Sequence, residues 1–235
     1  MRKRGSEVTF TNNYEEKVKA KDVRLTLKDG ESVKVVICTT EDYYQYPAHN
    51  DFNHGIFPQA CHEENCPLCA VAALGDEFKA LKVRDRYKFA FYVIDQDKIM
   101  AFDATAGQAK KLKDQITEDY YEDIEFGAVF TFKRVGNGKD TSYTLSLISE
   151  RKLTAKDKEA IEKYKGYHIP DEFFEDITEP VMKGYVYKLL EEKAGIDVRA
   201  MFPDAAEEMA KLNKDDENAT PTTPAGDDNE LPFNP

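Results

Sequence analysis

Three of the four cysteines stand close together in the stretch ACHEENCPLCA, residues 60–70. They are Cys61, Cys66 and Cys69, and the last two form a Cys-x-x-Cys pair. Two thiolates at this spacing can bind one tetrahedral metal ion, and Cys61 would supply a third ligand. A closed structural site needs a fourth ligand, so the chain must fold in a way that brings another donor to this stretch.

The fourth ligand is expected to be one of the four histidines. His62 adjoins Cys61 and would point the other way, and His168 is distant in the sequence. If YYQYPAH and IFPQAC are the arms of a hairpin with NDFNHG as its loop, His49 faces Cys61 across the two arms. We therefore expect His49 as the ligand, with His54 in the loop as the alternative.

Other uses of the cysteines fit the sequence less well. A thioredoxin-like redox pair belongs in a βαβ setting, and a nucleobase deaminase carries an HxE…PCxxC order that is missing here. Cys38 lies in an apolar strand and is expected to be a core residue. The sequence shows no nucleophile–base pair and no phosphate-binding glycine motif, so we expect one structural Zn²⁺ and no enzymatic activity.

Period-two patterns predict several strands. Val23, Leu25 and Leu27 alternate with polar residues, and SVKVVIC reads as the return strand of a hairpin that turns at Asp29-Gly30. RDRYKFAFYVID and KIMAFDA are expected to form a second hairpin. The stretch FGAVFTFKRVGNGKDTSYTLSLIS predicts two strands around a Gly-Asn-Gly turn, and residues 66–82 and 105–117 are expected to be helical.

These elements predict a mainly β fold with helical additions. The core is expected to be an OB-like β-barrel with an inserted zinc-binding lobe. We predict a polar and basic N-terminal arm (residues 1–20) and the core (21–150), which includes the zinc lobe (41–82). A helical extension (151–203) and a disordered acidic tail (204–235) are expected to follow. The tail carries nine acidic and two basic residues, which is −7 of the net −12, and its few apolar groups cannot offset the entropy of ordering.

Composition narrows the cellular setting. Apolar residues make up 41% of the 235 residues, which suffices for a buried core, and no apolar run approaches the ~18 residues of a membrane span. The start MRKRGSEVTF lacks the apolar stretch of a signal peptide. We expect a cytoplasmic protein (in the host cytoplasm if it is viral), where clustered thiols bind metal more often than they form disulfides.

Basic and aromatic residues interleave around the cysteines and in the strand that follows. Cations can follow phosphates while ring faces stack on unpaired bases, at about 1–3 kcal/mol for each base. The plainer interpretation is that the aromatic residues pack and the charges are solvated. In RYKFAFYV, one face is expected to be core, and the other carries Arg86, Lys88 and Tyr92. Candidate contacts are Tyr43, Tyr44, Tyr46, Lys82, Arg84, Arg86, Lys88 and Tyr92.

Four elements in order carry a resemblance to a known family. They are LTLKDGESVKVVICTT, His49, CHEENCPLC and LKVRDRYKFAFYVIDQDK. Over roughly residues 20–150, the chain resembles the zinc-containing single-stranded DNA-binding proteins of T-even-like bacteriophages, the helix-destabilising proteins of phage replication. The resemblance implies an OB-type barrel with an inserted zinc lobe. It also implies that the cleft between them binds single strands without sequence preference.

The resemblance assigns roles to individual residues. It implies that the zinc ligands are His49, Cys61, Cys66 and Cys69. It matches Arg84, Arg86, Lys88 and Tyr92 to the family's DNA-binding strand and, more loosely, Tyr43–Tyr46, Lys110 and Lys111. RKRGS at residues 2–6 resembles the short basic element that supports cooperative binding along the strand in that family.

The acidic tail agrees with the resemblance to these DNA-binding proteins. It is expected to occupy the basic cleft when DNA is absent and to recruit replication, recombination and repair proteins when DNA displaces it. The stretch DDNELPF also resembles the partner-binding tip of bacterial single-stranded DNA-binding proteins, which gives the candidates Asp227, Asp228, Glu230, Leu231, Pro232 and Phe233. The function expected is protection of single-stranded DNA. The alternative is a zinc-lobed adaptor that works mainly through protein contacts.

Overall fold

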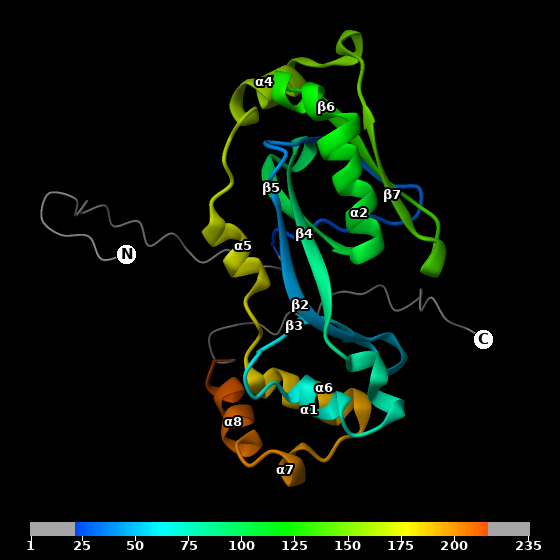
Figure 1. Cartoon of the computed structure of the whole chain (residues 1–235). Coiled ribbons are helices and arrows are strands. Elements are labelled where there is room, and N and C mark those ends of the chain that lie inside the picture. Colours follow the sequence, from blue (N-terminus) through cyan, green and yellow to red (C-terminus); the bar gives the residue numbers. More distant parts are fainter. Residues whose placement is uncertain (1–21, 216–235) are drawn as a thin grey trace, which may run out of the picture.

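The computed structural model describes residues 22–215 of the chain (Figure 1). The described part is mainly an antiparallel sheet curled into a half-barrel, with helices on both of its faces and at its foot. The predicted N-terminal arm and the partner-binding candidates of the tail lie outside the described residues.

The described residues form one seven-stranded sheet, in the order β3-β2-β4-β1-β6-β7 with β5 on the other edge of β4. Its predicted hairpins at β4–β5 and β6–β7 are confirmed by the antiparallel pairing of these strands. The strands are β1 (Ser32–Val36), β2 (Tyr43–Asp51), β3 (Ile56–Ala60), β4 (Arg84–Val93), β5 (Lys98–Thr105), β6 (Val129–Val135) and β7 (Ser142–Leu147).

Strand β4 is the longest and joins two parts of the molecule. Along one edge it pairs with β5 over its length, from Arg86 to Val93. Its other edge is divided, because β2 pairs with residues 84–89 and β1 pairs with Tyr92 and Val93. The first half of β4 therefore belongs also to the β2–β3 hairpin, and its second half belongs to the half-barrel.

Large apolar side chains fill the inner face of the half-barrel. Phe91, Phe102 and Phe132 are buried. The ring centroids of Phe91 and Phe102 lie 5.2 Å and 5.1 Å from that of Phe132. Helix α2 (Ala106–Asp114) closes this face with Ala109 and Leu112. A capping box of Thr105 and Gln108 starts α2. A π turn at Gln115–Asp119 and helix α3 (Tyr121–Phe126) follow it.

Two helices cover the outer face. Ala160 on α4 (Ala155–Tyr164) packs with Phe174 and Ile177 on α5 (Asp171–Thr178) against the sheet. The ammonium of Lys34 on β1 lies 2.7 Å from the carboxylate of Asp157 on α4, which fixes the helix to the strand.

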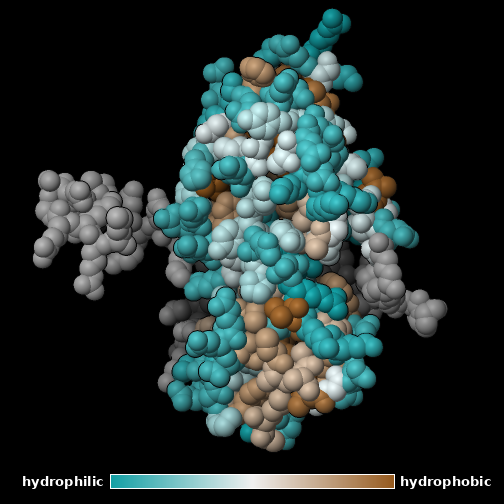
Figure 2. All heavy atoms as spheres, viewed as in Figure 1, coloured by the Kyte–Doolittle hydropathy of each residue, from teal (hydrophilic) through white to brown (hydrophobic). Residues whose placement is uncertain are grey.

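The remaining helices gather around the cysteines at the foot of the molecule (Figure 1). They are α1 (Pro67–Ala72), α6 (Lys183–Ala194), α7 (Val198–Met201) and α8 (Ala205–Asp215). Cys61 and Cys66 share one buried cluster with Val186, Tyr187 and Leu190 of α6. We call residues 43–82 the cysteine lobe and residues 183–215 the C-terminal helices. Figure 2 shows apolar side chains gathered low on this face, over α1.

Three predictions of local structure are corrected. Residues 23–27 do not pair with β1, because the Gly30 N–H donates to the Arg134 carbonyl oxygen and turns the chain away. Arg24 instead forms a parallel bridge with Ala101 of β5. The helix predicted at 66–82 is broken at Gly75 into α1 and a 3-10 turn at Asp76–Leu81. Residues 205–215 were expected in the disordered tail but form α8, since Ala205 is fully buried among the C-terminal helices.

Candidate metal centre

The β2–β3 hairpin brings His49 to Cys61. His49 is opposite Gln59 in this ladder, and Ala48 is opposite Ala60. Cys61 follows the end of β3, and its N–H donates to the Pro47 carbonyl oxygen. His49 and Cys61 are therefore diagonal neighbours on one face of the hairpin.

A tight turn returns the chain from Cys61 to Cys66. Glu63 and Asn65 adopt left-handed backbone angles, with φ of 58° and 53°, and such angles are uncommon for residues other than glycine. The Glu63 N–H donates to the Cys61 Sγ at 3.3 Å. Pro67 then begins α1, so Cys66 stands just before the helix and Cys69 within its first turn. The turn and the short helix thus direct all three thiols to one point.

The four side chains make a set of the right size for one metal ion. Their donor atoms, on His49, Cys61, Cys66 and Cys69, all lie within 4.8 Å of one another. Cys61 Sγ is 3.7 Å from Cys69 Sγ, and His49 Nε2 is 3.4 Å from Cys66 Sγ and 3.6 Å from Cys69 Sγ. A tetrahedron with metal–sulfur bonds of about 2.3 Å has sulfur–sulfur edges of roughly 3.8 Å, so these residues fit such an ion.

His49 is prepared to act as a ligand. Its ring is buried, and Nδ1 donates to the carbonyl oxygen of Leu81 at 2.6 Å. This hydrogen bond fixes the tautomer and leaves the Nε2 lone pair directed at the thiols. Metal-bound histidines commonly have such a partner on the other nitrogen.

The thiols differ in their acidity. Burial alone would raise the pKa of Cys66, but its hydrogen bond with His49 and the backbone hydrogen bonds from Cys69 and His62 lower it to about 5. Burial and the neighbouring Cys66 charge raise the pKa of Cys69 to about 12, and burial also raises the pKa of Cys61. One thiolate is favoured in this cluster, and a bound cation would stabilise all three.

The other histidines lie elsewhere. His54 Nδ1 is 2.8 Å from an Asp51 carboxylate oxygen, and the His54 ring contacts Phe78. His62 Nε2 donates to the Val181 carbonyl oxygen just before α6. The structure thus brings His49, and not His54, to the cysteines.

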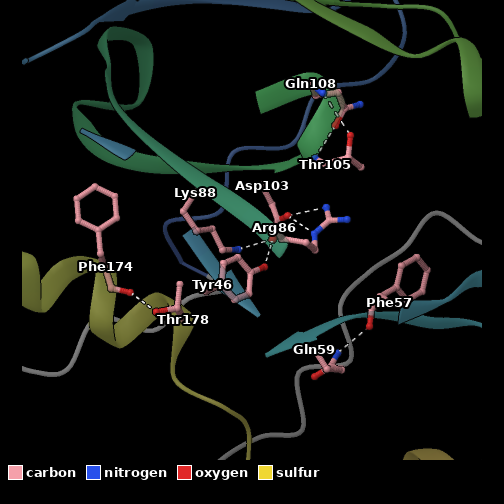
Figure 3. Close-up of polar contacts among 10 residues, drawn as sticks. All are labelled: Tyr46, Phe57, Gln59, Arg86, Lys88, Asp103, Thr105, Gln108, Phe174 and Thr178. Atoms are coloured by element: carbon pink, nitrogen blue, oxygen red, sulfur yellow. Dashed lines mark hydrogen bonds and ion pairs between the residues drawn. The ribbon is translucent and has the colours of Figure 1, made fainter. Parts of the chain in front are cut away.

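Three of the predicted DNA contacts converge on a carboxylate that the sequence analysis did not single out (Figure 3). Asp103 on β5 accepts hydrogen bonds of 2.6 Å from the Tyr46 hydroxyl, the Arg86 Nε and the Lys88 Nζ. The side chains of Arg86, Lys88 and Asp103 are 11–13% exposed. This cluster links β2, β4 and β5 where the lobe meets the half-barrel.

Burial and the neighbouring charges shift the pKa values of Asp103 and Lys88 in opposite directions. Burial would raise the pKa of Asp103, but the charges of Lys88 and Arg86 and the hydrogen bonds from Lys88 and Tyr46 lower it. Burial lowers the pKa of Lys88 against the effect of Asp103. The carboxylate therefore neutralises part of the charge that these two cations carry.

The remaining candidates divide between the surface and the core. Tyr44 is 42% exposed and stacks on Phe174. Tyr43 lies against Phe89, with the Lys113 ammonium 5.8 Å from its ring centroid. Tyr92 is buried and stacks on Tyr164, away from the cluster at Asp103. The candidates with exposed side chains at the start of β4 and on α2 are Lys82, Arg84, Lys110 and Lys111.

Comparison of the sequence with models of known protein families and with curated proteins found no match. Across residues 22–215, no helix combines the length and the apolar character needed to cross a membrane.

Proposed function

We propose that this protein binds single-stranded DNA without sequence preference, through an OB-like barrel and a zinc-stabilised lobe. The observation that carries the proposal is the register between β2 and β4. Tyr44 is opposite Lys88, Tyr46 is opposite Arg86, and Ala48 is opposite Arg84. Tyrosines and cations are thus cross-strand neighbours at the junction of the two parts.

This arrangement suits a flexible polyanion with unpaired bases. Directly opposed residues on one face of an antiparallel pair interact, so the exposed ring of Tyr44 lies beside the partly exposed Lys88, while Tyr46 is buried. The Lys88 ammonium lies 5.3 Å from the Tyr46 ring centroid. Base stacking on an exposed ring such as Tyr44 tolerates any sequence, and cations contribute a salt-dependent attraction to phosphates.

We infer that the metal is Zn²⁺ and that its role is structural. Three thiolates and one imidazole are a donor set typical of structural zinc. All four donors come from the protein, so the set leaves no open position for a reactant. Zinc bound here would stabilise the cysteine lobe, while the chain's own residues at the junction would contact DNA.

The proposal extends to the acidic tail through its sequence alone. Residues 216–235, beyond α8, carry five acidic side chains and no basic one, so this tail can compete with DNA for cations, and we propose that it recruits replication, recombination and repair proteins. Deleting residues 216–235 should leave DNA affinity unchanged or raise it. If the protein is mainly an adaptor, the deletion should instead abolish its main activity, the contact with replication proteins.

Fluorescence titration with oligo-dT tests the proposal. We expect binding that weakens as salt rises and that prefers single strands over duplex of the same length. Tyr44→Leu should weaken binding by about 1–3 kcal/mol through lost stacking. Tyr185→Leu on α6 is the matched control, because Tyr185 is 38% exposed. Equal affinity for duplex, or equal effects of the two variants, would contradict the proposal.

A further inference from the structure

The positive charge around Asp103 is only partly compensated. Arg86 and Lys88 share this one carboxylate. Arg24 lies beside Ala101 of β5, the strand that also carries Asp103. Within residues 22–215, neither Arg24 nor Arg134 has a carboxylate partner. Two arginines outside the predicted DNA-binding strand therefore add to the excess positive charge that Arg86 and Lys88 leave.

One hydrogen-bond donor of Arg134, its Nε, has no partner among the described residues. Arg134 lies on β6 directly opposite Tyr143 of β7. Its Nη1 donates to the Leu27 carbonyl oxygen at 2.8 Å, which holds the guanidinium in place. The unpartnered Nε is buried. A buried donor without an acceptor is costly unless a ligand or water supplies one.

Arg24 lies beside the strand that packs against the same tyrosine. It lies beside Ala101 of β5, and the next residue, Phe102, has its ring centroid 4.3 Å from that of Tyr143. The Arg24 side chain is exposed. Burial raises the pKa of Tyr143, while the charges of Arg134, Arg24 and Arg86 oppose that rise. Arg134 is thus the cross-strand neighbour of Tyr143, and Arg24 lies beside the strand whose Phe102 contacts the Tyr143 ring.

We propose that Arg24, Arg134 and Tyr143 form a phosphate-binding subsite for the backbone of a nucleic acid strand. Guanidinium groups match phosphate oxygens in charge and in planar hydrogen-bonding geometry, and the tyrosine hydroxyl supplies a further donor. The inference rests on the proposed function and extends it, because it assigns the phosphate contact to residues outside β2 and β4. Asp103 neutralises part of the charge of Arg86 and Lys88, so phosphate contacts at Arg24 and Arg134 would add to those of the β4 cations.

The salt dependence of oligo-dT binding tests this subsite. Each lost phosphate contact on a single strand should lower the slope of log K against log salt by about 0.7. We expect that loss in Arg24→Gln and in Arg134→Gln, and weaker binding without a change of slope in Tyr143→Phe. Arg24→Gln is decisive because its exposed side chain makes no hydrogen bond to the fold among the described residues. Arg199→Gln on α7, also exposed, is the matched control and should keep the wild-type slope.

The outcomes separate the subsite from the proposed function. If wild type binds oligo-dT and Arg24→Gln has the wild-type slope, the subsite is wrong and the proposed function stands. If wild type does not bind oligo-dT at low salt, both fail. Inorganic phosphate is the second probe. Binding of that ion with no effect of Arg24→Gln on DNA would make the site one for a free anion, and would overturn the inference.

Discussion

The half-barrel and the cysteine lobe with its C-terminal helices achieve stability in different ways. The half-barrel buries large side chains from neighbouring strands, among them Phe89, Phe91, Phe130 and Phe132. The lower cluster also buries large side chains such as Leu81 and Tyr187, but it closes around the thiols of Cys61 and Cys66, and some of its helices, such as α1 and α7, are short. Small bodies with little apolar surface to bury often need a metal or a disulfide. We propose that packing alone stabilises the first part and that a bound ion adds to the stability of the second.

Loss of a metal ligand should have the largest effect. Structural zinc supplies on the order of 10–16 kcal/mol in small zinc-binding peptides. Cys66→Ser should therefore abolish stoichiometric zinc in native mass spectrometry and make the cysteine lobe sensitive to protease. The control is Cys38→Ser, since Cys38 is buried in the half-barrel and burial raises its pKa to about 12. Retention of one zinc by Cys66→Ser would contradict the claim that Cys66 is a metal ligand that stabilises the cysteine lobe.

A core truncation in the half-barrel should give the converse result. Phe132 is fully buried and its ring contacts Phe91 and Phe102. Phe132→Ala should cost about 3–5 kcal/mol in urea unfolding because it leaves a cavity. Zinc stoichiometry should stay at the wild-type value. Loss of zinc from this variant would show that the two parts do not differ in the way described.

The contact between α6 and α8 offers a smaller test within the lower part. A Cβ added at Gly184 would clash with the backbone carbonyl of Glu208. Backbone cannot move aside as a flexible side chain can, so Gly184→Ala should destabilise the C-terminal helices by about 1–3 kcal/mol. Thermal unfolding followed by circular dichroism measures this loss. Gly75→Ala, where an added Cβ meets nothing within 4 Å, is the control and should have a smaller effect.

The junction between the two parts should show the smallest effect, and it should depend on pH. Tyr46→Phe removes one of the hydrogen bonds that lower the pKa of Asp103, at a cost of about 0.5–1.5 kcal/mol near neutral pH. A carboxyl whose folded-state pKa is lowered contributes stability above its unfolded pKa, and that contribution is lost as the pH falls through the folded pKa. Acid titration of the unfolding free energy should show the loss beginning at higher pH in Tyr46→Phe. An unchanged profile would contradict the role given to this hydrogen bond.

Local patterns sufficed to predict the strands and the ligand set. Alternation predicted β4 and its partner β5, and the hairpin hypothesis placed His49 on the face of Cys61. Asp103 could have been found in the same way, since extending the pairing outward from the turn near Asp97 brings it opposite Lys88. Asp103 was not predicted, because a carboxylate that pairs with a basic strand belongs to no catalytic motif.

The long-range contacts could not be read from the sequence. Nothing local to Val186 or Tyr187 shows that they pack against Cys66, which lies more than a hundred residues earlier. Arg24 was misplaced for the same reason. The Asp29-Gly30 turn predicted a hairpin, but Arg24 forms a parallel bridge to Ala101 of β5. Periodicity predicts which face of an element is buried, but it does not identify what covers that face.

Hydrogen exchange of the full-length protein, before and after zinc chelation, tests the central claim most directly. We expect that chelation removes amide protection from residues 43–82 and from 183–215 together, because one core joins them. Strands β6 and β7 should keep their protection. Protection that is unchanged throughout, or lost equally from all strands, would contradict a fold in which a metal ion organises one part and packing organises the other.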